Sequence, residues 1–142
     1  TGAVIMGRNV YEMADPFSWV NDEYEFQVPL FILTHTPPDK FPKGNDKLTV
    51  TFVTDGIPSA IAQAKEVTGD KVIQIIGGAD TIQQSLNLGL VDELWIDIMP
   101  VILGDGLRLF ENIDTSKIQL ERVKVEEMTP MRTSLVLKVT SK

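Results

Sequence analysis

The sequence contains no cysteine and only one histidine among its 142 residues. The lack of thiols excludes disulfide bonds, thiolate metal sites and a cysteine nucleophile, and it agrees with a reducing cytoplasm, where we expect the protein to reside. One histidine is too few for an ordinary zinc site, so no metal is expected. No apolar run approaches the roughly 20 residues that a membrane-spanning helix needs.

Three common nucleotide and catalytic motifs are also missing. No G-x-G-x-x-G follows an apolar run, which argues against an ordinary Rossmann site. No G-x-x-x-x-G-K-[ST] is present, so P-loop chemistry is excluded. G-x-S-x-G, the nucleophile turn of many hydrolases, is missing as well.

Acidic residues outnumber basic ones by 20 to 13, which gives a net charge of −7. This excess argues against nucleic acid and anionic membranes as partners, because both are negatively charged. Any phosphate on a ligand must then be held by local donors. The length predicts one domain over residues 1–142 with a substantial core.

Apolar runs separated by glycine and proline predict strands that alternate with helices, followed by a pair of strands joined by a short link. Such a link favours an antiparallel hairpin. The expected fold class is α/β with three layers, a mostly parallel sheet and an antiparallel C-terminal hairpin. The expected strands cover residues 3–6, 29–34, 48–53, 71–76, 94–99, 119–126 and 134–140. Three helices are expected: one that begins near Asn9, one over residues 57–67 and one over residues 81–88.

The strongest local signal is the pair Gly77-Gly78, which follows an apolar strand and precedes a helix. Glycines let a ligand approach the main chain, and the free N–H groups at a helix N-terminus suit a phosphate. The alternative is a tight strand-to-helix connection without a ligand. Asp80 is suited to capping the helix but would repel a phosphate. Thr81 is the better candidate for a hydroxyl contact.

Two further strand ends carry polar residues. Arg8 follows a strand and a glycine and could meet a phosphate with its planar guanidinium, although a solvated surface arginine is the alternative. His35, beside Thr34 and Thr36, has no obvious partner for a role as catalytic base. Because open α/β sheets bind ligands at the carboxyl ends of their strands, we expect these ends to share one extended ligand. The segments concerned are Met6-Gly7-Arg8-Asn9-Val10, Leu33-Thr34-His35 and Ile76-Gly77-Gly78-Ala79-Asp80-Thr81.

A fourth segment, 100–106, ends a strand with the turn Gly104-Asp105-Gly106. A plain turn explains this pattern. The functional alternative is a wall or lid of a substrate cleft.

Several of these segments resemble one superfamily over nearly the whole chain. Residues 3–12 and 75–81 are similar to the strand-to-helix segment and the glycine pair of dihydrofolate reductases. Leu90-Val91-Asp92-Glu93-Leu94, followed by residues 100–106, is closer to the RibD C-terminal reductase branch of that superfamily.

The resemblance implies NADPH as the cofactor and a cis peptide between Gly77 and Gly78. It places residues 6–10 along the pyrophosphate, residues 33–35 beside the adenosine and its 2′-phosphate, and residues 76–81 at the nicotinamide ribose and pyrophosphate. The superfamily's first strand and substrate-side loop have no counterpart in residues 1–142. The domain is therefore expected to lack them, and the catalytic residues stay unknown.

The leading hypothesis is an NADPH-dependent reductase of a small heterocyclic substrate, pyrimidine- or pterin-like. At the family level it is linked to reduction of 5-amino-6-(5-phosphoribosylamino)uracil in riboflavin biosynthesis. The alternative is a non-catalytic nucleotide-binding protein that keeps the fold, and an FMN carrier is a third possibility. The resemblance also implies a homodimer, to which apolar residues of the last strands and Trp95 would contribute.

Overall fold

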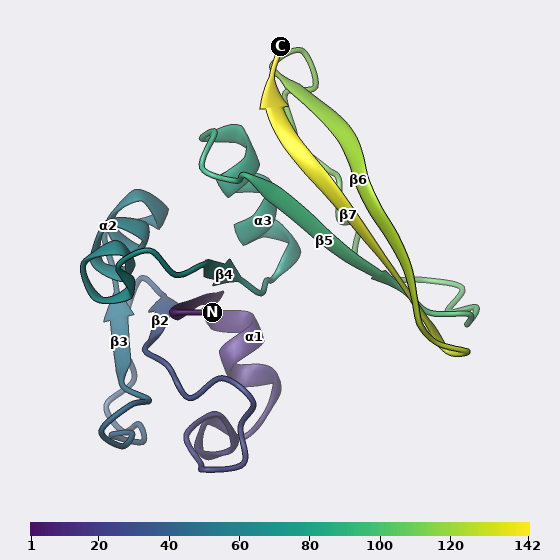
Figure 1. Cartoon of the computed structure of the whole chain (residues 1–142). Coiled ribbons are helices and arrows are strands. Elements are labelled where there is room, and N and C mark those ends of the chain that lie inside the picture. Colours follow the sequence, from purple (N-terminus) through teal and green to yellow (C-terminus); the bar gives the residue numbers. More distant parts are fainter. The chain divides into compact units, whose positions relative to one another are not determined.

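The computed structural model describes every residue, Thr1–Lys142, and the chain divides into two compact units (Figure 1). The first unit is Thr1–Ile82 and the second is Gln83–Lys142. The first contains a parallel sheet of four strands, and the second contains an antiparallel sheet of three. The predicted α/β class and the antiparallel C-terminal hairpin are both confirmed. The strands form two sheets, whereas the sequence predicted one.

The sheet of the first unit has the strand order β3-β2-β1-β4, and all neighbours are parallel. Its inner strand β1 is shielded on both faces, as expected of an apolar run in a parallel sheet. The elements of this unit are β1 (Ala3–Gly7), α1 (Arg8–Met13), a 3-10 turn η1 (Pro16–Trp19), β2 (Leu30–Leu33), β3 (Val50–Val53), α2 (Ile57–Thr68) and β4 (Ile73–Ile75).

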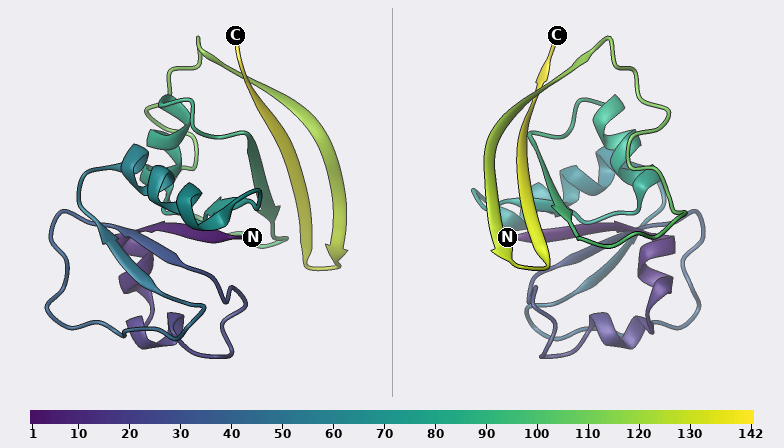
Figure 2. Two further views of the ribbon diagram at one scale, coloured as in Figure 1. Left: turned by 60° about the vertical axis from the view of Figure 1, so that its left-hand side comes forward. Right: turned by 90° about the vertical axis from the view of Figure 1, so that its right-hand side faces the viewer.

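Helices cover both faces of this sheet, with α1 on one side and α2 on the other (Figure 2). Side chains alternate along a strand, so Val4 and Met6 point to the same face of β1. Both lie in a core cluster with Tyr11 of α1. The buried residues of that cluster are Val4, Met6, Tyr11, Leu30, Ile32 and Leu48.

Helix α2 is bounded by glycines in conformations that other residues rarely adopt. Gly56 precedes it with φ of 96°, Pro58 stands in its first turn, and Gly69 ends it with φ of 59°. Proline fits there because the first N–H groups of a helix have no intrahelical partner. Its buried residues recur at helical spacing and form one apolar stripe: Ile57, Ala60, Ile61, Ala64 and Thr68.

Helix α1 is short, and the chain turns directly after it. Asp15 Oδ1 accepts a hydrogen bond from Phe17 N at 3.1 Å and so caps η1. Trp19 Nε1 donates to Tyr11 O at 2.9 Å, which ties η1 back to α1. The Asp15-Pro16 stop agrees with the sequence prediction, while η1 was not predicted.

The second unit is dominated by the long β6–β7 hairpin, with β5 beside β7 (Figure 1). The order is β5-β7-β6. Helix α3 precedes these strands, and the division between the units falls inside it. The elements are α3 (Ala79–Asn87), β5 (Glu93–Ile98), β6 (Ile118–Thr129) and β7 (Arg132–Ser141).

Several predicted boundaries were wrong by a few residues. Helix α3 begins at Ala79 and ends at Asn87, whereas the sequence predicted 81–88. Strand β4 is shorter than the predicted 71–76, but its hydrogen bonds continue beyond it. Gly2 N donates to Val72 O at 2.7 Å, and Ile76 N donates to Ile5 O at 3.0 Å. No helix combines the length and the apolar character needed to span a membrane.

Candidate functional site

The carboxyl ends of β1, β2 and β4 lie at the same edge of the parallel sheet. Gly7 is paired with Leu33 in the β1–β2 register, and Ile5 is paired with Ile75 in the β1–β4 register. The chain leaves each strand at this edge through one of the predicted segments. The topology therefore brings the three strand ends to one edge, while their sharing of one ligand stays a prediction.

Gly7 and the Gly77-Gly78 turn lie directly against one another. Gly7 N donates to Gly77 O at 2.8 Å, so the β1–β4 pairing extends into the turn. A Cβ atom on Gly7 would stand 2.7 Å from Thr81 Oγ1 and 3.6 Å from Gly78 N. Only glycine fits at position 7 without displacing Thr81. The first turn of α3 is thereby packed close to the end of β1.

The Gly77-Gly78 peptide is cis, as the family resemblance implies, and Gly77 has φ of 133°. A Cβ on Gly77 or Gly78 would meet Val10 Cγ2 at 3.4 or 3.5 Å. The turn therefore rests on the α1 side chain of Val10. Gly7, Val10 and Thr81 thus all contact or border this turn.

Arg8 connects the end of β1 with the segment after β2. Its Nε donates to Glu12 Oε1 at 2.7 Å, and its NH1 donates to Thr36 O at 3.3 Å. Thr34 Oγ1 also donates to Thr36 O, at 3.0 Å. Arg8 and Thr34, which the sequence placed at the candidate site, therefore share one carbonyl acceptor.

The remaining predicted residues differ in how they are placed. Met6 is fully buried in the core, so only its main chain can reach a ligand. Ile76 packs against the same core, and Leu33 is half-buried. Asn9 and His35 are exposed. Ala79 and Asp80 form the first turn of α3, where the Asp80 carboxylate stands close in sequence to the glycines.

Glu12 contacts the candidate site but was not predicted, and Thr36 was named at its strand end but not assigned to the ligand. The spacing of Arg8 and Glu12, four residues apart in a helix, is a signal that could have identified Glu12. Thr36 takes part through its carbonyl oxygen, which no side-chain pattern reveals. The candidate site therefore contains a carboxylate, Glu12, that forms a hydrogen-bonded ion pair with Arg8.

Tyr11 is the buried residue of α1, and its side chain belongs to the core of the first unit. Its ring meets Phe52 edge to face at 5.7 Å, and its hydroxyl is buried without a hydrogen-bond partner. Burial raises the pKa of Tyr11, and the neighbouring Glu12 carboxylate raises it further. The phenol is therefore neutral at ordinary pH and packs as an apolar ring.

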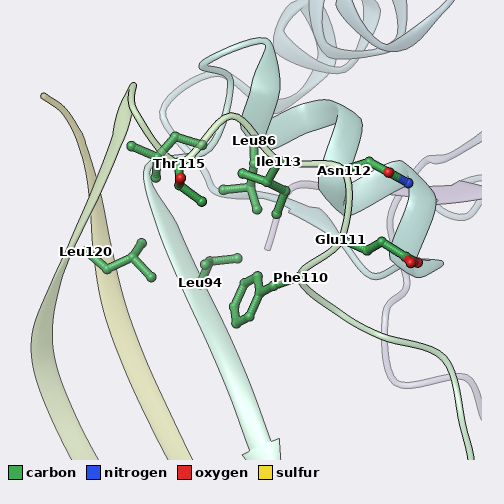
Figure 3. Close-up of a pocket in the computed structure, with 9 residues that line it drawn as sticks. Leu86, Leu94, Phe110, Glu111, Asn112, Ile113, Thr115 and Leu120 are labelled. Atoms are coloured by element: carbon green, nitrogen blue, oxygen red, sulfur yellow. The ribbon is translucent and has the colours of Figure 1, made fainter.

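The second unit has a separate cavity of about 250 Å³, which opens between the end of α3, β5 and the start of β6 (Figure 3). The sequence analysis did not predict it. Apolar side chains predominate in its lining, which consists of Leu86, Leu94, Phe110, Glu111, Asn112, Ile113, Thr115, Ile118 and Leu120. Two amides of α3 hold the adjoining loop: Gln83 donates to Arg108 O and Leu109 O, and Asn87 donates to Asn112 O.

The Gly104-Asp105-Gly106 turn lies in the same unit, in a segment without regular structure. Asp105 Oδ1 accepts a hydrogen bond from Gly106 N at 2.8 Å, and Gly104 has φ of 75°. The apolar side chains beside it are exposed, Ile102 fully so. Its proposed role as a wall or lid stays a prediction.

The family model of the RibD C-terminal domain matches residues 1–132. The chain therefore belongs to the RibD C-terminal domain family. Two curated relatives from Bacillus subtilis, the uncharacterized proteins YwjB and YyaP, are each 29% identical over 122 and 123 residues. These alignments cover 85% and 84% of the chain but 66% and 64% of the relatives. The chain thus spans slightly less than two thirds of either relative.

Solved structures show the same fold. A "Putative riboflavin biosynthesis protein" from Shewanella sp. PV-4 is 28% identical, has a TM-score of 0.69, and aligns over 97% of this chain and 73% of its own. A pyrimidine reductase-like protein from Corynebacterium diphtheriae is 17% identical, with a TM-score of 0.65 and coverages of 99% and 76%.

Dihydrofolate reductase from Enterococcus faecalis, solved with NADP(H), is 16% identical, with a TM-score of 0.60 and coverages of 98% and 74%. At such identities the likeness is one of fold. The fold is therefore dihydrofolate reductase-like.

Proposed function

We propose that the chain binds NADPH across the ends of β1, β2 and β4 and belongs to a reductase of a small heterocyclic substrate. The observation that carries this proposal is the contact between Gly7 and the Gly77-Gly78 turn. There, the main chains of two strand ends come within hydrogen-bonding distance, with the side chains of Thr81 and Val10 packed against the glycines. Gly7 and Gly78 are only half-buried, so a flat or phosphate-bearing ligand can approach their backbone closely.

The residues present fit a dinucleotide with two phosphate-bearing parts. Arg8 supplies a cation in a protein whose net charge is −7, and Thr34 supplies a hydroxyl beside it. At the other end, the glycine turn leads into α3, whose first N–H groups favour negative charge. Asp80 opposes a phosphate there, so Thr81 is the hydroxyl that we assign to this end.

In such an enzyme the nicotinamide supplies the hydride, while the protein orients the reactants and excludes water. The Gly77-Gly78 main chain would support one face of the ring, with Val10 behind it. The substrate class follows from the family: a pyrimidine such as 5-amino-6-(5-phosphoribosylamino)uracil, or a pterin. No proton donor is assigned within residues 1–142.

A binding protein without turnover is the second candidate. Two carboxylates favour a binding protein without turnover: Glu12 accepts a hydrogen bond from Arg8, and Asp80 lies in the first turn of α3. Both reduce the positive potential that a phosphate needs. In that case the chain would bind NADPH but would not oxidise it.

Titration with NADPH, followed by the fluorescence of the nucleotide, tests the proposal. We expect saturable binding and, for Arg8→Ala, a loss of roughly tenfold in affinity, because hydrogen bonds to charged groups contribute about 1.5–3 kcal/mol. Arg122→Ala, on exposed β6, is the matched control and should bind as the wild type does. Binding that neither variant affects, or no binding at high micromolar NADPH, would contradict the proposal.

The two candidates separate in a second measurement. Consumption of NADPH in the presence of pyrimidines and pterins supports the reductase. Tight binding without consumption across that panel supports the binding protein.

We further propose that the chain forms a homodimer. The support is the exposed apolar side chains on both faces of β5, with Trp95, 72% exposed, on one face and Ile98 on the other. Exposed large apolar side chains are typical of surfaces that a partner covers. Light scattering coupled to size exclusion should give twice the mass of the chain, and a monomer at working concentration would remove this proposal.

A further inference from the structure

The guanidinium of Arg8 is held at two points in the first unit. Glu12, one turn further along α1, accepts from Nε at 2.7 Å. The carbonyl of Thr36 accepts from NH1 at 3.3 Å. The side chains of Arg8 and Glu12 are 46% and 47% exposed, so a dissolved ligand can reach them.

The two contacts determine which donors of Arg8 stay open. A guanidinium carries five N–H donors in a rigid planar fork. One is used by Glu12 and one by Thr36. The uncommitted donors are those of NH2 and the second N–H of NH1, which form the end of the fork. A phosphate can accept from two such parallel donors at once.

Arg8 shares the Thr36 carbonyl with Thr34, in the segment that the family resemblance places beside the 2′-phosphate. We propose that the open end of the Arg8 fork meets this 2′-phosphate, which NADH lacks, and that Glu12 is a positioning residue for Arg8 that raises the preference of the site for NADPH over NADH. This inference depends on the proposed NADPH-binding function. Glu12 accepts from Nε while the Thr36 carbonyl accepts from NH1, so the guanidinium is held beside the Thr34–Thr36 segment. An arginine free to rotate would have to be ordered again by each ligand that binds.

A carboxylate next to a phosphate site also has an opposing effect, because it lowers the local positive potential. The half-exposed position of Glu12 weakens that effect, since water and salt screen exposed charges. Orientation is not screened in this way. We therefore expect the loss of orientation to outweigh the relief of repulsion when Glu12 is removed.

The experiment measures the dissociation constants of NADPH and NADH for the wild type, Glu12→Ala and Glu12→Gln. Alanine removes the acceptor and is a good helix former, so α1 should persist. Glutamine keeps a carbonyl oxygen for Nε and removes only the charge. Glu66→Ala, an exposed carboxylate of α2, controls for the change in net charge.

For Glu12→Ala we expect NADPH binding to weaken by about five- to tenfold, as for loss of one oriented charge-assisted contact, and NADH binding to change by less than about twofold. Glu12→Gln should restore NADPH binding to at least the wild-type level. Glu66→Ala should leave both constants unchanged. The resonance of the Arg8 Nε–H group should broaden or shift in Glu12→Ala and return in Glu12→Gln.

Other results would overturn the inference in distinguishable ways. If wild type binds NADPH but Glu12→Ala binds it equally well or more tightly, Glu12 is only a surface ion pair or a competitor, and the proposed function stands. If NADH affinity falls as much as NADPH affinity, the role of Glu12 is general to the fold. If wild type binds neither nucleotide, both the proposed function and this inference fail.

Discussion

In Thr1–Ile82 the strands β1 and β2 are almost completely shielded from water, whereas in Gln83–Lys142 the buried apolar side chains are Leu86 and Leu94. The first unit surrounds its parallel strands with apolar side chains from α1 and α2. In the second unit the long strands β6 and β7 leave most of their side chains exposed or half-buried.

Local polar contacts hold parts of the second unit together. Gln83 and Asn87 of α3 hold the 108–114 loop by its main chain. Asp97 of β5 accepts one hydrogen bond from Ser134 of β7, and its Oδ2 lies 3.6 Å from NH1 of Arg132, also on β7. Apolar burial therefore stabilises the first unit to a larger degree than the second.

The largest expected effect is a truncation in the first core. Leu30 is a fully buried residue of β2, the strand between β1 and β3. Leu30→Ala should lower the free energy of unfolding by about 3–5 kcal/mol. Ile102→Ala, in the second unit, changes a fully exposed side chain and should stay within about 0.5 kcal/mol. Urea denaturation measures both. Equal losses would remove the distinction between the units.

A second test adds one methyl group where the first unit is tightest. Gly7→Ala should cost about 1–3 kcal/mol, because the new Cβ would stand 2.7 Å from Thr81 Oγ1. The backbone of Gly7 is extended, with φ of −75°, so the cost is one of space alone. Combining Gly7→Ala with Thr81→Ala should recover part of it. A double variant whose losses simply add would mean that this contact is not the cause.

Much of the first unit could be predicted from its sequence. The apolar run at residues 3–6 belongs to a strand buried on both faces, and such runs are easily recognised. Gly56, Pro58 and Gly69 are boundary signals of α2 with a direct conformational reason. The three strand ends of the candidate site were found for the same reason, since parallel strands direct their carboxyl ends to one edge.

The parts that were missed depend on contacts between residues distant in sequence or on main-chain atoms. The Arg8–Thr36 hydrogen bond uses a carbonyl oxygen 28 residues away, and no residue type at position 36 is required for it. The cavity beside Leu94 arises from the path of the 110–115 loop, which has no periodic pattern. Strand β6 extends past the predicted residue 126 because its pairing with β7 continues to Thr129.

A smaller effect is expected for the amide that holds the loop in the second unit. Gln83 is buried and donates to Arg108 O at 2.9 Å and to Leu109 O at 3.1 Å. Gln83→Ala should destabilise the protein by about 1–2 kcal/mol, the usual cost of leaving buried acceptors unpaired. Hydrogen exchange should accelerate around residues 108–114 and not in β1. Uniform acceleration in both units would contradict the local role of Gln83.

The smallest expected effect is a pH dependence in the same loop. The Ser116 hydroxyl donates to Asp114 Oδ1 at 2.5 Å, and this hydrogen bond is the largest cause of the lowered pKa of the Asp114 carboxyl. The Ser116 N–H and the charge of Lys117 lower the pKa further. A carboxyl whose pKa is lower in the folded than in the unfolded state stabilises the folded state at every pH above its unfolded-state pKa. This contribution disappears as the pH falls through the folded-state pKa.

We therefore expect Asp114 to titrate in the folded protein at a lower pH than an ordinary aspartate does. Carboxyl-carbon NMR across the acid range measures the midpoint. Ser116→Ala should move it upward, because it removes the first contributor to the lowered pKa. Ser18→Ala, in the other unit, should leave it in place. A midpoint that Ser116→Ala does not move would show that Lys117, at 3.5 Å, and not the hydroxyl, holds the carboxylate charged.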